Sequence, residues 1–266
     1  MIRSIVLTNF FVTQPQIVQI VVDRALGSAP RGSGTEMFVS ASDRLGTIGG
    51  GQLEHRAIAA ARQMLERGDI ETQFALPLGP EIGQCCGGHV SLRLTLLDAT
   101  RKTALLNIAA QAEQALPKVY IFGAGHVGRA LATGLKPLPF ALRLIDSRES
   151  EIALADPAIF SKVTPLPEAE IRQAPKGSAF VILTHDHSLD FQLAAEALVR
   201  RDAAYVGMIG SKTKRAALEK WIKQTHEDLT TDALICPIGG GRIRNKLPEV
   251  IATFVAAELL VVFGAS

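Results

Sequence analysis

The stretch KVYIFGAGHVG, residues 118–128, decides the fold of the second half of the chain. Its first five residues are a short, mostly apolar run, and the glycines after it are spaced G-x-G-x-x-G and lead into a helical pattern. In such a turn Gly123 permits the sharp reversal, Gly125 lets a phosphate approach the backbone, and Gly128 lets the helix pack closely against its strand. The helix would begin at His126, where its N-terminus presents positive partial charge to an anion. This stretch therefore predicts a strand, turn and helix that bind a phosphate group.

Asp146 lies at the end of the next strand-like run, 23 residues after Gly123. A carboxylate at this place binds the ribose hydroxyls in dinucleotide-binding folds. The alternative for Asp146 is a helix cap or an ordinary loop carboxylate. Together with the glycine turn, Asp146 predicts a Rossmann-like domain with a crevice of nucleotide size. A nucleotide such as NAD(P) is therefore a candidate ligand, although the fold alone does not identify what is bound.

The rest of the second half alternates short apolar runs with helical patterns. The predicted strands are residues 118–122, 141–145, 180–183 and 205–209, and the predicted helices are residues 126–135, 189–200, 212–224 and 248–263. Apolar runs that are buried on both faces and separated by helices are typical of a parallel sheet with right-handed crossovers. The fold class is therefore predicted as α/β, with a C-terminal parallel sheet over residues 117–266 and helices on both of its faces.

Polar residues follow two of these strands. The sequence Thr-His-Asp-His at 184–187 comes directly after a strand, and ligands of open α/β sheets lie outside the carboxyl ends of the strands. We therefore expect His185 to contact a ligand. Alternatives for His185 and His187 are metal binding, which needs a third ligand from elsewhere in the chain, and hydrogen bonds within the loop.

Ser211 and Lys212 follow the last of these strands at the start of a predicted helix. Ser211 fits an N-cap, and Lys212 stands where an anion would meet free backbone N–H groups. The alternative is an ordinary capped helix with a solvated cation. Further on, residues 239–246 (GGGRIRNK) form a basic, glycine-rich loop before Pro248, whose role the sequence leaves open.

The first half, residues 1–100, is predicted to be a smaller α+β domain. Its predicted strands are residues 17–22, 37–39 and 90–96, its predicted helix is residues 52–67, and residues 98–117 are predicted to be a linker leading into a helix that Pro117 ends. Three consecutive glycines, Gly49, Gly50 and Gly51, precede the helix at 52–67. They either expose N–H groups to an anion or allow close chain packing, and Arg31 could reach the same anion.

The sequence QCCGG at 84–88 is the most unusual part of the chain. Cys85 and Cys86 would point to opposite sides of an extended segment, which argues against both binding one metal. The chain has three cysteines and therefore no second pair to complete a structural zinc site. A glycine-flanked thiol could meet a soft metal or receive sulfur, and the alternative is a buried structural cysteine.

Composition excludes several classes of protein. The 266 residues carry 28 Lys and Arg against 26 Asp and Glu, a formal charge of +2 without a concentrated basic face, which argues against nucleic-acid binding. The cysteine count does not support a disulfide framework and indicates a reducing compartment. The apolar stretch 250–263 is too short to span a bilayer. We therefore expect a cytoplasmic protein without a membrane segment.

Seven motifs in both halves of the chain together resemble the xanthine dehydrogenase accessory protein family, XdhC/CoxI. They are GSAPR (27–31), GTIGGGQLE (46–54), GQCCGG (83–88), GAGHVG (123–128), LTHDHSLD (183–190), GMIGSK (207–212) and CPIG (236–239). The resemblance covers nearly the whole chain, in order. It implies a maturation chaperone rather than an enzyme. Such a protein binds molybdenum cofactor (molybdopterin), supports its sulfuration with a cysteine desulfurase, and inserts it into apo xanthine dehydrogenase.

The resemblance also implies roles for particular residues. Cys85 and Cys86 become thiols close to the cofactor and its molybdenum, and the glycines of residues 123–128 become contacts for the pterin phosphate or a nucleotide. The loop 239–246 departs from the family pattern, because it is more glycine-rich and more basic. Two alternatives remain, an NAD(P)-dependent oxidoreductase and a relay that carries persulfide. A homodimer is also left open.

Overall fold

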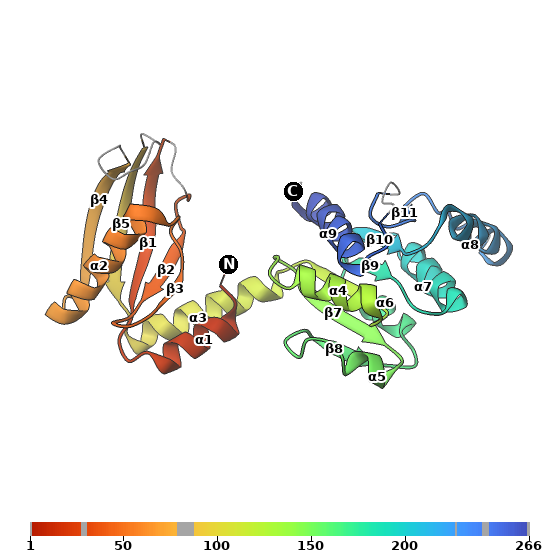
Figure 1. The fold of residues 1–266 in the computed structure, drawn as a ribbon, viewed down its shortest axis with the longest axis horizontal. Coiled ribbons are helices and arrows are strands. Elements are labelled where there is room, and N and C mark those ends of the chain that lie inside the picture. The colour runs from red at the N-terminus through yellow and green to blue at the C-terminus, as the bar shows by residue number, and fades with distance from the viewer. Residues whose placement is uncertain (1, 28–30, 79–87, 227, 241–244, 265–266) are drawn as a thin grey trace. The chain divides into compact units, whose positions relative to one another are not determined.

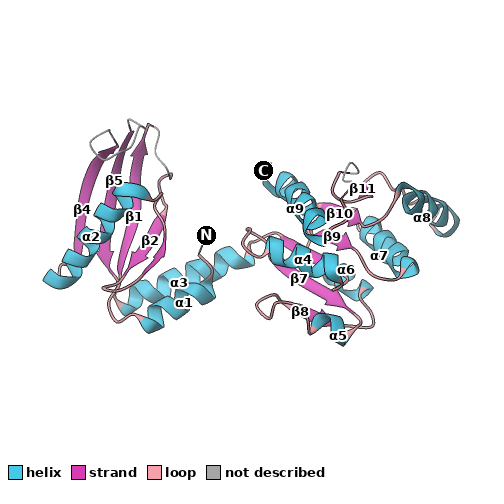
Figure 2. Ribbon diagram, viewed as in Figure 1, coloured by secondary structure: helices cyan, strands magenta, loops and turns pink. Residues whose placement is uncertain are grey.

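A computed structural model describes residues 2–27, 31–78, 88–226, 228–240 and 245–264 (Figures 1 and 2). The chain divides into two compact units, Met1–Gln114 and Ala115–Ser266. The first unit extends past residue 100, where the sequence analysis ended the N-terminal domain, because helix α3 (Ala99–Gln114) packs within it. Within the described part of the chain, none of the helices combines the length and apolar character needed to cross a bilayer.

The first unit is an antiparallel sheet with the strand order β3-β2-β1-β5-β4. Its strands are β1 (Val18–Leu26), β2 (Glu36–Val39), β3 (Arg44–Gly46), β4 (Glu71–Leu78) and β5 (Gly88–Leu96). Helix α2 (Gly51–Arg67) packs against the sheet through Leu53, Ala57, Ala61 and Met64, which recur at helical spacing. The helix ends at Gly68, which has a left-handed conformation with φ 76°.

Helix α1 (Ser4–Thr13) lies beside α3 in the same unit (Figure 1). Its Phe10 and Phe11 enter a small apolar cluster with Phe38 of β2, and Ser4 donates two hydrogen bonds of 2.7 Å to the Glu113 carboxylate of α3. The sequence analysis does not predict α1, because residues 4–13 lack an apolar face with helical periodicity. Packing against α3, rather than local pattern, supports this helix.

The second unit is a parallel sheet with the strand order β11-β10-β9-β6-β7-β8. Its strands are β6 (Lys118–Phe122), β7 (Ala141–Asp146), β8 (Ser161–Val163), β9 (Ala179–Ile182), β10 (Tyr205–Met208) and β11 (Leu234–Ile235). The chain runs outward from β6 to β8 and then crosses to β9 on the other side. This is the strand order of the dinucleotide-binding fold, so the predicted Rossmann-like class is confirmed.

Alternate residues of β6 serve the two faces of this sheet. Val119 and Ile121 pack with helices α4 (His126–Leu135) and α9 (Pro248–Gly264). Tyr120 and Phe122 pack on the other face with α6 (Glu168–Gln173), α7 (His187–Val199) and α8 (Lys212–Thr225). The predicted helices on both faces are thereby confirmed, and Figure 2 shows them around the strands. The short helix α5 (Glu149–Ile152), which the sequence analysis does not predict, follows β7.

The three glycines of the turn after β6 have different physical roles. Gly123 has φ +112°, and a Cβ there would lie 2.3 Å from the carbonyl oxygen of Leu183. A Cβ at Gly128 would lie 1.8 Å from the carbonyl oxygen of Gly123. Gly125 has φ −65°, and a Cβ there would meet no neighbouring atom of the described chain within 4 Å, so the fold does not require glycine at this position. Two of the glycines therefore build the turn, and Gly125 leaves space in front of it.

We predict that Gly128→Ala destabilises the second unit by about 1–3 kcal/mol or more, because its methyl group would overlap a backbone oxygen. Gly134→Ala is the matched control, since Gly134 lies on the same helix with open space around it. This change should stabilise the helix by up to about 1 kcal/mol. The chain's single tryptophan, Trp221, lies in α8, so its fluorescence during urea unfolding reports on this unit alone. Equal midpoints for the two variants would contradict the assigned role of Gly128.

Candidate functional site

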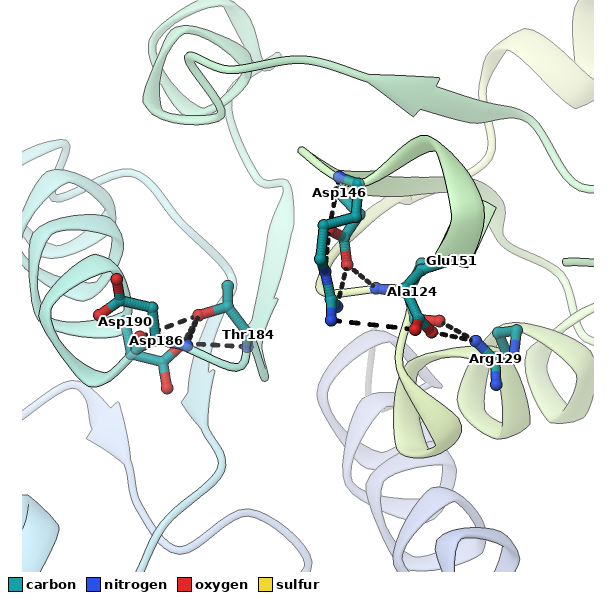
Figure 3. Close-up of polar contacts among 8 residues, drawn as sticks. Ala124, Arg129, Asp146, Glu151, Thr184, Asp186 and Asp190 are labelled. Carbon is teal, nitrogen blue, oxygen red and sulfur yellow. Dashed lines mark hydrogen bonds and ion pairs between the residues drawn. The ribbon is translucent and has the colours of Figure 1, made fainter. Parts of the chain in front are cut away.

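The loops after the parallel strands gather at the carboxyl edge of the second unit's sheet. The strand order reverses between β6 and β9, and open α/β sheets bind ligands in the crevice at such a switch point. Here the turn at Gly123 abuts the end of β9 at Leu183 and Thr184. Figure 3 shows a polar cluster on each side of this point, one around Asp146 and one around Asp190.

Asp146, at the end of β7, is buried and fully engaged by the chain itself. One carboxylate oxygen accepts from the backbone N–H of Ala124 at 2.7 Å, and Arg148 donates to the carboxylate from Nε at 3.0 Å, Nη2 at 2.8 Å and its backbone N–H at 3.0 Å. Burial alone would raise the pKa of Asp146, but these hydrogen bonds and the charge of Arg148 hold that pKa below its ordinary value. The ribose contact expected for Asp146 stays a prediction.

Arg129 connects the glycine turn to the helix that follows β7. Its Nη1 donates to the carbonyl oxygen of Ala124 and to Glu151 of α5, both at 2.6 Å (Figure 3). Ala124 is thus held through its N–H by Asp146 and through its C=O by Arg129. The backbone in front of α4 is fixed from both sides before any ligand is present.

Asp190, in the first turn of α7, organises the opposite side of the switch point. Its side chain has no solvent exposure and accepts from the backbone N–H of Thr184 at 3.0 Å and from the hydroxyl of Thr184 at 2.7 Å (Figure 3). Its other oxygen pairs with the ammonium group of Lys214, which also donates to the carbonyl oxygen of Ile209 at 3.0 Å. One buried carboxylate thereby ties the loops after β9 and β10 to helices α7 and α8.

The residues around His185 serve the local structure of this loop. Asp186 is the N-cap of α7 and accepts from the backbone N–H groups of Ser188 and Leu189. His185 and His187 are exposed. Among the residues that the structure describes, no three His, Cys, Asp or Glu side chains are arranged to hold a metal ion. The third ligand that the metal alternative requires is therefore not found there, and the ligand contact of His185 stays a prediction.

A cavity of about 480 Å³ opens beside the glycine turn on the β10 and β11 side of the crevice. Its apolar lining consists of Val127, Ile209, Pro237, Ile238 and Ile251, and its polar lining includes Ser211, Asn245 and Lys246. Ser211 is the N-cap of α8, as predicted, and accepts from the Lys214 backbone N–H at 3.2 Å. Lys212 is exposed next to it. The volume lies within the range of about 300–1,000 Å³ that is usual for small-molecule sites.

In the first unit, the glycine-rich loop before α2 encloses a carboxylate of the same chain. Glu54 accepts from the backbone N–H groups of Ile48 at 3.2 Å and Gly50 at 3.1 Å, from the hydroxyl of Thr47, and from the guanidinium group of Arg44. Burial would raise the pKa of Glu54, but Thr47, the two N–H groups and Arg44 lower it below 4.5. Two of the N–H groups that an external anion would need are thus already satisfied.

The remaining candidate residues of the first unit are two glycines, an arginine and two cysteines. Gly49 and Gly51 flank Gly50 with positive φ values of 123° and 63°. Arg31 is exposed in the loop between β1 and β2. Cys85 and Cys86 fall outside the described residues, so the predictions for both cysteines stay predictions. The third cysteine, Cys236, is buried near Lys214, and burial raises the pKa of its thiol.

Sequence reasoning missed Glu54, Arg148 and the Asp190–Lys214 pair, which hold these loops. Glu54 stands at the end of the motif GTIGGGQLE, four residues after Gly50, and Arg148 stands two residues after Asp146. Both spacings are visible in the sequence, but only the folded chain shows that these side chains turn back onto the adjacent loop. The Asp190–Lys214 pair links two helices and has no local signal.

Two family models match the chain, and the proteins similar to it include an Escherichia coli sequence and a Bacillus halodurans structure. Residues 119–259 match the XdhC Rossmann domain, and residues 14–74 match the XdhC and CoxI family. Escherichia coli K12 YqeB, described as uncharacterized, is 26% identical over 258 residues, which are 92% of this chain and 42% of YqeB. The chain thus spans less than half of that relative. A Bacillus halodurans crystal structure described as a xanthine dehydrogenase shares the fold, with a TM-score of 0.79, 18% identity and coverage of 99% of this chain and 96% of that one.

We predict that Glu54→Gln destabilises the first unit by about 1.5–3 kcal/mol at neutral pH, because it weakens several hydrogen bonds to a charged group. A lowered pKa in the folded state stabilises the protein above the ordinary pKa of 4.5, and this stabilisation is lost as the pH falls through the folded value. The wild-type unit should therefore lose more stability in acid than the variant does. Urea unfolding followed by circular dichroism measures this, with Trp221 fluorescence as the control for the second unit. The same pH dependence in both proteins would contradict the role of Glu54.

Proposed function

Because the chain belongs to the XdhC family, we propose that it serves the maturation of a xanthine dehydrogenase by carrying molybdenum cofactor to the apoenzyme. The observation that carries the proposal is the cavity beside the glycine turn, which combines an apolar wall with polar groups at its rim. In this role the protein is a carrier rather than an enzyme. The cofactor is its cargo and supplies redox chemistry only after transfer to the dehydrogenase.

The lining of the cavity suits a flat, polar heterocycle such as a pterin. Ile209, Pro237 and Ile251 offer apolar surface to the ring faces, while Asn245 and Ser211 offer hydrogen-bonding groups to the ring edges. Sites of this kind combine apolar walls with a few convergent polar groups. The donor set therefore fits the organic part of the cofactor.

The anionic end of the cofactor has a suitable place at the adjacent helix terminus. Helix α4 begins at His126 with no side-chain cap among the described residues, and Gly125 leaves the space before it open. Backbone N–H groups at a helix N-terminus favour a phosphate. Lys246, at the rim of the cavity, adds a cation. Both features support the binding of a phosphorylated pterin at this edge.

Sulfuration of the cofactor with a cysteine desulfurase belongs to the same proposal. Cys85 and Cys86 are the proposed thiols near molybdenum, and this part of the proposal rests on the sequence alone. The site residues proposed in the first unit, which are Arg31 and the glycines at 49–51 where α2 begins, have the same basis.

An NAD(P)-dependent oxidoreductase is the second candidate function. The strand order and the glycine turn of the second unit favour it, because both are features of dinucleotide-binding domains. The two functions differ in stoichiometry. A carrier activates at most about one apoenzyme site per bound cofactor, whereas an oxidoreductase turns over repeatedly without a protein partner.

We predict that protein purified from a molybdenum-replete host contains molybdopterin and activates apo xanthine dehydrogenase stoichiometrically. Xanthine oxidation should rise with added protein and reach a plateau set by the ratio of bound cofactor to apoenzyme. Pterin fluorescence after oxidation measures the molybdopterin content, and metal analysis measures the molybdenum content. The activation assay measures xanthine oxidation by the reconstituted enzyme. Steady oxidation of NAD(P)H by the isolated protein, with no activation of the apoenzyme, would favour the second candidate.

We also predict that Gly125→Val lowers the pterin content of the purified protein without lowering its stability. A valine is compatible with the φ of −65° and with the open space at this position, but it would stand where the phosphate approaches. Gly134→Val is the control, because it makes the same change in open space near the other end of α4, the helix that Gly125 precedes. Equal pterin content in the two variants would show that the turn does not bind the cargo.

A further inference from the structure

Arg148 is hydrogen-bonded to Asp146, the carboxylate at the position that dinucleotide-binding folds use to bind the ribose. An ionised carboxylate has about four lone-pair positions for hydrogen bonds. Asp146 receives four, one from the backbone N–H of Ala124 and three from Arg148. A ribose diol could bind Asp146 only by displacing the bidentate, charge-assisted contact from the Arg148 guanidinium group. Contacts of this kind are among the stronger hydrogen bonds in proteins. The structure therefore disfavours recognition of an unmodified ribose at this position.

Arg148 still has donors to offer to a ligand. The Nε and Nη2 atoms contact Asp146, whereas Nη1 lies 3.9 Å from the nearest Glu151 oxygen, beyond hydrogen-bonding distance. The side chain remains 32% exposed, and the neighbouring Ser147 is exposed as well. A guanidinium group presents five N–H donors in a rigid plane, so one edge can hold Asp146 while another binds an oxyanion.

The charges around this end of the crevice also permit an anion. A free Asp146 would repel a phosphate, but its pairing with Arg148 cancels that charge, and Glu151 is paired with Arg129 at 2.6 Å. In dinucleotide-binding folds, an arginine near this position accommodates the phosphate on the ribose 2′ position. We propose that the β7 end of the crevice binds a nucleotide whose ribose carries a 2′-phosphate, and that Arg148 selects it over the nucleotide with a free ribose diol.

This inference goes beyond the proposed carrier function and does not depend on it. The cavity assigned to the pterin lies beyond β9, along β10 and β11, whereas Arg148 follows β7 on the other side of β6. A nucleotide at the β7 end would give the protein a second ligand besides its cargo. Nucleotides alone serve as probes of this site, so the outcome is separate from that of the cofactor experiments.

Adenosine 2′,5′-bisphosphate and adenosine 5′-monophosphate differ only in the 2′-phosphate and are the probes. We expect isothermal titration of the full chain to show binding of the bisphosphate about tenfold tighter or more, which is the effect of one added charge-assisted hydrogen bond. Adenosine 3′,5′-bisphosphate tests the position of the phosphate and should bind more weakly than the 2′,5′ isomer. Equal affinity for the two bisphosphates, a preference for the monophosphate or no binding of either probe would overturn the proposal.

Arg148→Ser should reverse the preference, because it removes the phosphate contact and frees two acceptor positions of Asp146. Binding of the bisphosphate should weaken about tenfold or more, and binding of the monophosphate should strengthen. The matched control is Arg172→Ser, since Arg172 of α6 makes the same bidentate contact with Glu196 of α7. An unchanged affinity ratio in Arg148→Ser, or the same change in Arg172→Ser, would overturn the role of Arg148.

Arg148→Lys keeps the positive charge but lacks the planar guanidinium group with its two parallel N–H donors. This variant provides the test if Arg148→Ser does not fold. Its melting temperature, followed through Trp221 fluorescence, serves as the check on the second unit. We expect Arg148→Lys to bind the bisphosphate less tightly than the wild type while retaining some preference for it over the monophosphate. A lysine variant with the wild-type ratio would show that the planar guanidinium group does not determine the selectivity.

Discussion

The absence of a side chain at residue 123 is the constraint on which the second unit's crevice depends. The backbone of Gly123 lies so close to the end of β9 that a Cβ would come within 2.3 Å of the Leu183 carbonyl oxygen, and a Cβ at Gly128 would come within 1.8 Å of Gly123 itself. These contacts bring β6, α4 and the loop after β9 together, backbone against backbone. Because the turn is closed in this way, the start of α4 and the open position at Gly125 face the carboxyl edge of the sheet.

Buried carboxylates hold the loops around these glycine-rich turns in both units. Asp146 binds the N–H of Ala124 in the second unit, and Glu54 binds the N–H groups of Ile48 and Gly50 in the first. Asp190 does the same for Thr184 on the opposite side of the switch point. Each carboxylate is balanced by an arginine or lysine, which offsets the cost of burying its charge. Loops ordered in this way lose less conformational entropy when a ligand binds.

The crevice therefore has two ends with different chemistry. The end along β10 and β11 combines apolar walls with Asn245 and Lys246, and we assign it to the pterin cargo. The end at β7 presents Arg148 beside a carboxylate that is already satisfied, and we assign it to a phosphorylated ribose. The glycine turn lies between them and could serve the phosphate of either ligand.

The sequence by itself determined the fold class and the place of the crevice. The spacing of Gly123, Gly125 and Gly128 and the alternation of apolar runs with helical patterns follow from local geometry, and the structure confirms the four predicted strands of the second half to within one residue at each end. Only the tertiary structure decided what the polar side chains do. Asp146 has the sequence position of a ribose ligand, yet Arg148 folds back onto it, and Glu54 turns into its own loop. Helix α1 likewise depends on α3, about a hundred residues away. Periodicity records which residues are buried, whereas hydrogen-bond partners depend on distances between loops, and these exist only in the folded chain.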